Sequence, residues 1–147
     1  MEICKAMRPK HLLVVEDNDI LRKTLERYLS GQGINVITTR TVKGARDLLT
    51  ARSFDAMLLD INLPDDCGLD LIAPPSESAI PVIAMTAKDP TRHRQRAYDA
   101  GVAAFLEKPF ALTAINRILK CVFAGHRCLP YCTQVPHMKI APGCLQS

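Results

Sequence analysis

Short apolar runs alternate with segments of helical periodicity between Lys10 and Lys120. The apolar runs predict five strands, at residues 11–17, 34–39, 55–60, 80–87 and 103–108. The longer segments between and after them place apolar side chains three or four positions apart and predict helices at residues 19–33, 41–53, 89–101 and 111–125. Continuous apolar runs are typical of strands buried on both faces, and strands that alternate with helices form parallel sheets. We therefore predict an α/β fold with a doubly wound, five-stranded parallel sheet.

The third helix of this pattern is predicted to be shortened. After Gly68, only residues 69–73 could be helical, because Pro74 and Pro75 follow them. Proline lacks a backbone donor and moves the residue before it out of the helical region. We expect one or two helical turns at this point.

The length of 147 residues fits one domain with a core of its own. We place this domain at residues 10–125, after an N-terminal extension at residues 1–9. Residues 126–147 have no periodicity and frequent prolines, which predicts an irregular C-terminal tail.

Composition and charge limit the classes of partner. No apolar run approaches the ~18 residues of a membrane span, and the start of the chain has no signal-peptide centre. We therefore expect a cytoplasmic protein without membrane contact. The net charge is +4, but bases are interleaved with acids, which argues against direct binding of nucleic acid.

Four of the six cysteines lie in the last 27 residues. Without a secretory signal, reduced thiols are the expectation. A zinc site built from His126, Cys128, Cys132, His137 and Cys144 is a less favoured alternative, because the tail has no C-x-x-C pair.

Polar side chains stand at the ends of four predicted strands. The first run ends in Glu16 and Asp17, the third ends in Asp60, the fourth carries Thr86, and the fifth ends in Lys108. Open parallel sheets bind ligands beyond the carboxyl ends of their strands. We therefore expect these five side chains to converge.

Three gathered carboxylates require a cation. Two like charges ~4 Å apart repel each other by about 4 kcal/mol at an effective dielectric near 20. Mg²⁺ prefers oxygen ligands and is usually held by one or two carboxylates. We predict a magnesium site with Asp17 and Asp60 as direct ligands and Glu16 acting through water.

A metal ion beside a carboxylate, a hydroxyl and an ammonium suits phosphoryl transfer, in which catalysis consists mainly of positioning and of neutralising charge. Asp60 can act as the nucleophile and become an aspartyl phosphate. Lys108, and Thr86 with a backbone amide near Ala87, would then hold phosphoryl oxygens. The sequence therefore predicts that Asp60 is phosphorylated.

The chain from Lys10 to Phe123 resembles the receiver domain of bacterial two-component response regulators, the CheY-like family of flavodoxin-like folds. The motifs that carry the resemblance are, in order, VVED, LLDINLPDDCGLDLI, VIAMTA and AAFLEKPF. The resemblance implies that the backbone carbonyl of Asn62 binds the metal and that Pro64 and Gly68 shape the loop after Asp60. It also implies that the peptide between Lys108 and Pro109 is cis.

The resemblance further implies a phospho-accepting signalling switch rather than a conventional enzyme, one that assists its own phosphorylation and dephosphorylation. The phosphoryl donor would be a histidine kinase or a histidine phosphotransfer protein. Thr86 would move toward the phosphoryl group and Phe105 would turn inward. This movement would alter a face made by residues 90–100, 103–107 and 112–123, through which an output partner or a second copy could bind.

Two features depart from the family pattern: the third helix is shortened, and the last 27 residues are too few for the output domain that commonly follows. Two other functions are weighed against the switch. A haloacid-dehalogenase-type hydrolase would need a second aspartate where Asn62 stands. A degenerate receiver that acts only as an interaction module is disfavoured by the intact Asp60, Thr86 and Lys108. The arginines on residues 90–100 are expected to form a solvated face.

Overall fold

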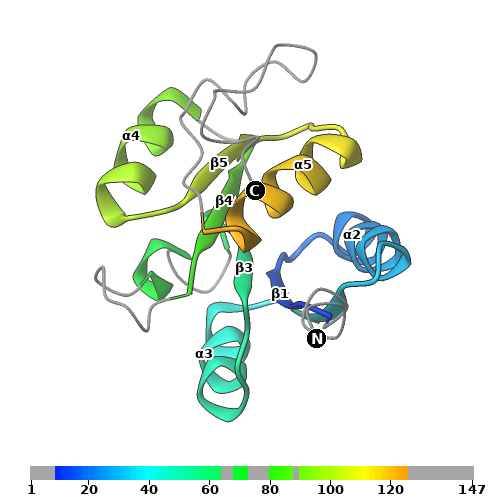
Figure 1. The fold of residues 1–147 in the computed structure, drawn as a ribbon. Helices are drawn as coiled ribbons and strands as arrows, with labels where there is room; N and C mark the ends of the chain where they lie inside the picture. Colours follow the sequence, from blue (N-terminus) through cyan, green and yellow to red (C-terminus); the bar gives the residue numbers. More distant parts are fainter. Residues whose placement is uncertain (1–8, 64–67, 73–79, 88–89, 126–147) are drawn as a thin grey trace.

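The computed structural model describes residues 9–63, 68–72, 80–87 and 90–125 (Figure 1). The predicted tail and its alternative zinc site lie outside the described residues, as do Pro64 and all but the last residue of the N-terminal extension. The elements along the chain are β1 His11–Val15, α2 Asp19–Gly31, β2 Asn35–Thr39, α3 Val42–Ala51, β3 Ala56–Asp60, the 3-10 helix η1 Gly68–Leu71, β4 Val82–Thr86, α4 Pro90–Ala100, β5 Ala104–Glu107 and α5 Leu112–Phe123.

The five strands form one sheet in the order β2-β1-β3-β4-β5, and every neighbouring pair is parallel. The predicted fold class is therefore confirmed. The strand order reverses between β1 and β3, so the connections from these two strands leave toward opposite faces of the sheet. In such sheets a crevice opens at this point beyond the carboxyl ends of the strands.

Helices cover both faces of the sheet (Figure 1). Side chains alternate across a strand, so Leu12 and Val14 of β1 pack with α2 and α5, while Leu13 and Val15 pack with α3 and α4. All four side chains are fully buried. The sheet is thus fixed between two apolar layers, and only its ends are open to a ligand.

Local sequence signals set the ends of the elements. The side chain of Asn18 caps α2 by accepting a hydrogen bond of 2.9 Å from the backbone N–H of Leu21. Thr41 caps α3 in the same way through Gly44, at 3.0 Å. The predicted short third helix is a single 3-10 turn, η1, within the residues that the structure describes.

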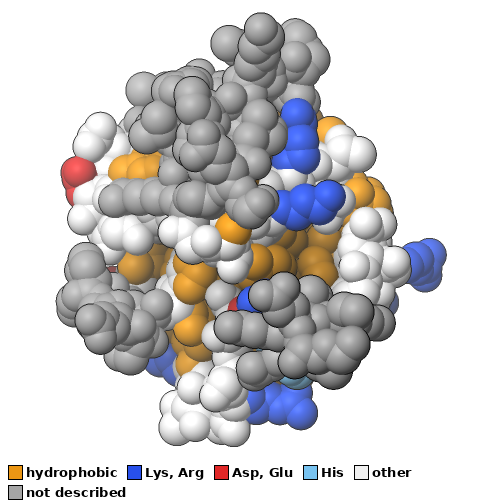
Figure 2. All heavy atoms as spheres, in the orientation of Figure 1, with side chains coloured by type: hydrophobic (Ala, Val, Ile, Leu, Met, Phe, Trp, Pro, Cys, Tyr) orange, Lys and Arg blue, Asp and Glu red, His pale blue; other side chains and the backbone are white. Residues whose placement is uncertain are grey.

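The space-filling view shows the surface on the same side (Figure 2). Among the described side chains on this face, Lys and Arg are plainly visible and acidic groups are scarce. Within the described ranges, the structure contains no helix with the length and apolar character that crossing a membrane requires.

Candidate functional site

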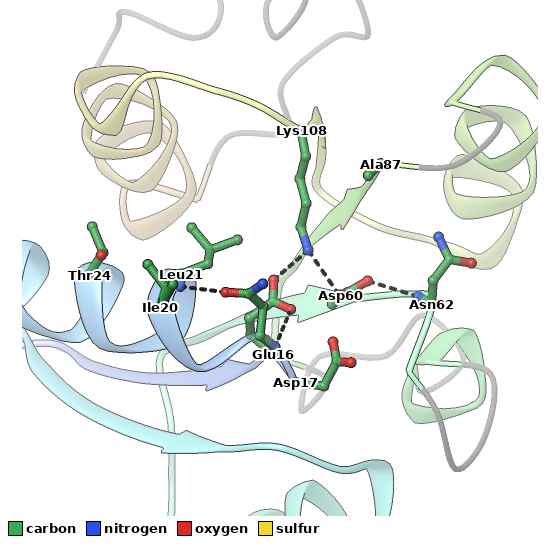
Figure 3. Close-up of a pocket in the computed structure, with 10 residues that line it drawn as sticks. Glu16, Asp17, Ile20, Leu21, Thr24, Asp60, Asn62, Ala87 and Lys108 are labelled. Carbon is green, nitrogen blue, oxygen red and sulfur yellow. Dashed lines mark hydrogen bonds and ion pairs between the residues drawn. The ribbon is translucent and has the colours of Figure 1, made fainter.

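Three carboxylates meet where the strand order reverses (Figure 3). Glu16 and Asp17 follow β1, and Asp60 is the last residue of β3. One carboxylate oxygen from each of the three lies within 4.8 Å of the others. Glu16 is fully buried, Asp60 is 4% exposed and Asp17 is half-buried. The structure therefore brings these three residues together, as expected from the sequence.

Lys108 supplies the cation of this cluster. Its Nζ donates hydrogen bonds to Glu16 Oε1 at 2.5 Å and to Asp60 Oδ2 at 2.9 Å. The backbone N–H of Lys108 donates to the carbonyl of Thr86 at 2.8 Å, which continues the pairing of β5 with β4. The peptide between Lys108 and Pro109 is cis, as the resemblance implies.

The buried charges change one another's protonation equilibria. Burial, together with the neighbouring Asp60 carboxylate, raises the pKa of Glu16 to about 7, although the hydrogen bonds from Lys108 and from the backbone of Asn18 oppose the rise. Burial by itself lowers the pKa of Lys108, but its hydrogen bonds to Glu16 and Asp60 outweigh this effect and hold the pKa above its usual value. Lys108 is therefore an ammonium at neutral pH.

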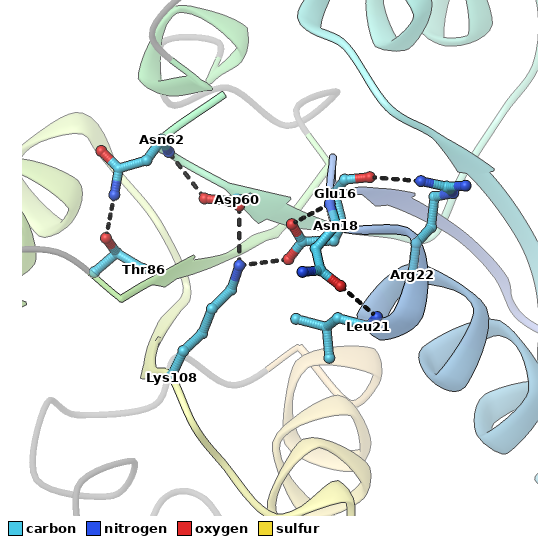
Figure 4. Close-up of polar contacts among 8 residues, drawn as sticks. All are labelled: Glu16, Asn18, Leu21, Arg22, Asp60, Asn62, Thr86 and Lys108. Atoms are coloured by element: carbon cyan, nitrogen blue, oxygen red, sulfur yellow. Dashed lines mark hydrogen bonds and ion pairs between the residues drawn. The ribbon is translucent and has the colours of Figure 1, made fainter. Parts of the chain in front are cut away.

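Asn62 links Asp60 to Thr86 (Figure 4). Its backbone N–H donates to Asp60 Oδ1 at 2.9 Å, and its side-chain amide donates to Thr86 Oγ1. Thr86 is fully buried at the end of β4. The family resemblance implied a role for the backbone carbonyl of Asn62, but nothing in the sequence indicated the contact from its side chain to Thr86.

The turn between β1 and α2 has supports that the sequence analysis missed. The backbone N–H of Asn18 donates to Glu16 Oε2 at 3.1 Å, and Arg22 donates from a terminal guanidinium nitrogen to the carbonyl of Glu16 at 3.3 Å. The local pattern identifies Asn18 as a possible helix cap but does not indicate its contact with Glu16. No local pattern marks Arg22, because a basic residue in the first turns of a helix is most often solvated.

A cavity of about 610 Å³ opens above the carboxylates. Its lining comes from the β1–α2 segment and from the ends of β3, β4 and β5: Glu16, Asp17, Asn18, Ile20, Leu21, Thr24, Asp60, Asn62, Ala87 and Lys108. A neighbouring hollow of about 360 Å³ shares Leu21, Ala87 and Lys108 and adds Pro109 and Phe110. Among the described residues, the carboxylates thus line a cavity at the end of the sheet, where a ligand can reach them.

Phe105, expected as a switch residue, lies outside this cavity. It is already fully buried in the apolar layer beneath α3 and α4, so in this structure the inward position expected of it after phosphorylation is occupied from the start. The guanidinium of Arg94 stands 5.7 Å from the centre of its ring and forms an ion pair with Glu107. Arg92 and Arg96 are exposed, so two of the three arginines of α4 are solvated. The third, Arg94, is paired within the domain.

The donor atoms of the cluster fit a hard divalent cation. Glu16, Asp17 and Asp60 present only oxygens, and no histidine or cysteine joins them among the described residues. Carboxylate oxygens at an open, partly hydrated site are the ligands that Mg²⁺ prefers. Lys108 contacts Glu16 and Asp60 but has no hydrogen bond to Asp17 among the contacts described.

Comparison with known proteins assigns the family. The family model described as the response regulator receiver domain matches residues 12–120. The swarming motility regulation protein RssB of Serratia marcescens is 40% identical over 114 residues, which cover 76% of this chain and 52% of that protein. The KDP operon transcriptional regulatory protein KdpE of Escherichia coli is 34% identical over 119 residues, which cover 79% of this chain and 52% of that protein.

Solved structures agree with this assignment. The non-phosphorylated HemR receiver domain from Leptospira biflexa is 31% identical, with a TM-score of 0.70, and the match covers 80% of this chain and 95% of that one. The chemotaxis response regulator CheY4 of Vibrio cholerae, at 23% identity and a TM-score of 0.71, shares the fold.

The chain belongs to the response regulator receiver domain family. Such domains accept a phosphoryl group on an aspartate in two-component signalling. The chain spans about half the length of the curated relatives it matches.

Proposed function

We propose that Asp60 is the phosphoryl acceptor of this receiver and that a histidine kinase or a histidine phosphotransfer protein is the donor. The observation that supports this most is the position of Lys108, whose ammonium contacts both Asp60 and Glu16 at the floor of the cavity. An ammonium beside the acceptor carboxylate neutralises charge that develops on the transferred group.

Mg²⁺ is the proposed cofactor. Glu16, Asp17, Asp60 and the backbone carbonyl of Asn62 would hold it, and Glu16 would act through water. When bound, the ion offsets the negative charge of the phosphoryl oxygens. The proximity of the three carboxylate groups supports this assignment.

In the transfer step, a carboxylate oxygen of Asp60 forms a bond to phosphorus. The bond from phosphorus to the donor's imidazole nitrogen breaks, and its electron pair stays on that nitrogen. Lys108 holds one phosphoryl oxygen, while Thr86 and the backbone amide near Ala87 hold another. These groups both assist phosphorylation and take part in dephosphorylation, so the domain is a self-assisting switch rather than an enzyme that acts on other substrates.

The signal leaves through the face made by residues 90–100, 103–107 and 112–123. Thr86 moves from Asn62 toward the phosphoryl group, and Phe105 follows as the second switch residue. A shift between two states from 1:99 to 99:1 requires about 5.5 kcal/mol of differential stabilisation, which several charge-assisted contacts to the phosphoryl oxygens can supply. An output protein or a second copy of the chain reads this face.

The receiver unit comprises residues 10–125 and works in the cytoplasm, without membrane contact and without direct contact to nucleic acid. The interleaving of basic and acidic residues along the chain supports the last point.

Acetyl phosphate with Mg²⁺ tests the acceptor. Intact-mass spectrometry should find one added phosphoryl group on the wild type and none on Asp60→Asn. Asp47→Asn is the matched control, because Asp47 is an exposed aspartate of α3, and it should be phosphorylated normally. An unmodified wild type under these conditions would refute the proposal, and turnover of a phosphate ester would favour the hydrolase.

A further inference from the structure

Arg22 joins two parts of the turn that carries the acidic residues. One terminal nitrogen of its guanidinium forms an ion pair with Asp19 Oδ1 at 2.7 Å, and the other donates to the carbonyl of Glu16 at 3.3 Å. The side chain of Arg22 is only 12% exposed. A half-exposed Asp19 therefore holds the partly buried guanidinium of Arg22 against the backbone next to the site.

The carbonyl that Arg22 contacts belongs to the peptide between Glu16 and Asp17. On the preceding side, the N–H of Glu16 donates to the carbonyl of Thr39 at 3.0 Å, which is the last sheet contact of this strand. On the following side, the carbonyl of Asn18 accepts from the N–H of Arg22 at 2.9 Å, which begins the helix. The peptide between them has neither sheet nor helix to orient it, and Arg22 supplies that orientation.

Asp17 depends on this peptide more than Glu16 does. The Glu16 side chain is held by Lys108 and by the N–H of Asn18. The Asp17 carboxylate makes no hydrogen bond within the part of the chain that the structure describes. Its direction toward the other two carboxylates is therefore set by its backbone.

We propose that Arg22 is a positioning residue for the metal site: its guanidinium fixes the peptide between Glu16 and Asp17 and thereby aims the Asp17 carboxylate at the cation. This inference rests on the proposed Mg²⁺ site. Arginine suits the task because its rigid planar fork reaches two acceptors at once, whereas lysine offers a single point charge. Residues that orient metal ligands typically change metal affinity by 10- to 100-fold when replaced.

Charge repulsion alone predicts the opposite change in Mg²⁺ affinity when Arg22 is replaced. A positive charge near a divalent cation repels it, so removal of the Arg22 charge should tighten Mg²⁺ binding if charge were all that mattered. If Arg22 orients Asp17, its removal weakens binding despite the lost repulsion. The direction of the change therefore separates the two roles.

Isothermal titration of the metal-free protein with MgCl₂ gives the dissociation constant directly, and the chain has no tryptophan for a fluorescence titration. We expect Arg22→Lys, which keeps the charge and loses the fork, to raise the dissociation constant roughly tenfold. Arg22→Met should raise it as well. The control is Arg40→Met, because Arg40 is 63% exposed and reaches Asp19 only at 3.6 Å, and it should leave the constant unchanged or lower.

An unchanged constant in Arg22→Lys, or a lower one in Arg22→Met, would overturn the inference. Thermal unfolding of each metal-free variant accompanies the titration. If both Arg22 variants lose their fold, Arg22 supports the whole domain and the inference also fails. A wild type that binds no Mg²⁺ would instead refute the proposed magnesium site, so the two failures are distinguishable.

Discussion

The ammonium of Lys108 donates a hydrogen bond of 2.9 Å to the carboxylate of Asp60, although 48 residues separate the two in sequence. The same nitrogen contacts Glu16, which lies 92 residues away. One cation therefore balances two buried acids that stand at the ends of different strands, β1 and β3. This arrangement leaves neither buried carboxylate without a partner in the metal-free domain and places the positive charge beside the proposed acceptor.

Replacement of Lys108 by methionine should destabilise the domain in the absence of metal. Removal of one partner from a buried ion pair leaves uncompensated charge, and we expect a loss of about 3 kcal/mol in the free energy of unfolding. Urea unfolding in the presence of a chelator, followed by circular dichroism, measures it. Lys23→Met, at an exposed position of α2, should cost far less. Equal stability of Lys108→Met and wild type would contradict the balancing role.

Mg²⁺ should stabilise the folded domain through the three carboxylates. A ligand at 100 times its dissociation constant adds about 2.7 kcal/mol to the free energy of unfolding. Asp17→Asn should abolish most of this gain, because it removes a ligand that protrudes into the cavity. Asp47→Asn should keep the gain. The measurement is the unfolding midpoint with and without MgCl₂, and an undiminished gain in Asp17→Asn would refute the role of Asp17.

Gly68 lies against the backbone that carries Asp60. A Cβ at this position would stand 2.7 Å from the carbonyl oxygen of Asp60 and 3.0 Å from Ile61 Cα, so the backbone would have to shift. We expect Gly68→Ala to cost about 2 kcal/mol of stability and to slow phosphorylation by acetyl phosphate. Gly31→Ala is the control, because nothing lies within 4 Å of its added Cβ. If the Gly68→Ala domain is as stable and as reactive as wild type, the close packing of Gly68 against the backbone of Asp60 is not required.

Thr86→Val should separate metal binding from switching. Thr86 is not one of the clustered carboxylates, so the dissociation constant for Mg²⁺ should change less than about threefold. Without the hydroxyl, beryllofluoride should no longer shift the amide NMR signals of β5 around Phe105. Thr24→Val is the matched control, because Thr24 lines the same cavity and should respond as wild type does. A full response in Thr86→Val would remove Thr86 from the switch.

The sequence by itself determined the kinds and order of the elements. Helix and strand periodicity, capping residues and prolines act over a few neighbouring residues, so the order of strands and helices and the shortness of the third helix follow from local patterns. The same patterns placed Glu16, Asp17, Asp60, Thr86 and Lys108 at strand ends. Parallel pairing brings such ends to one edge of the sheet, so their convergence followed as well.

Only the tertiary structure decided which side chains touch. The contact of Asn62 with Thr86, the burial of Phe105 beside Arg94 and the reach of Arg22 to the carbonyl of Glu16 depend on side-chain torsions within packed layers. These torsions are fixed by neighbours distant in sequence rather than by local preference. The order of the strands then set the distances across the site. It places the end of β5 near enough to the ends of β1 and β3 for the side chain of Lys108 to contact Glu16 and Asp60.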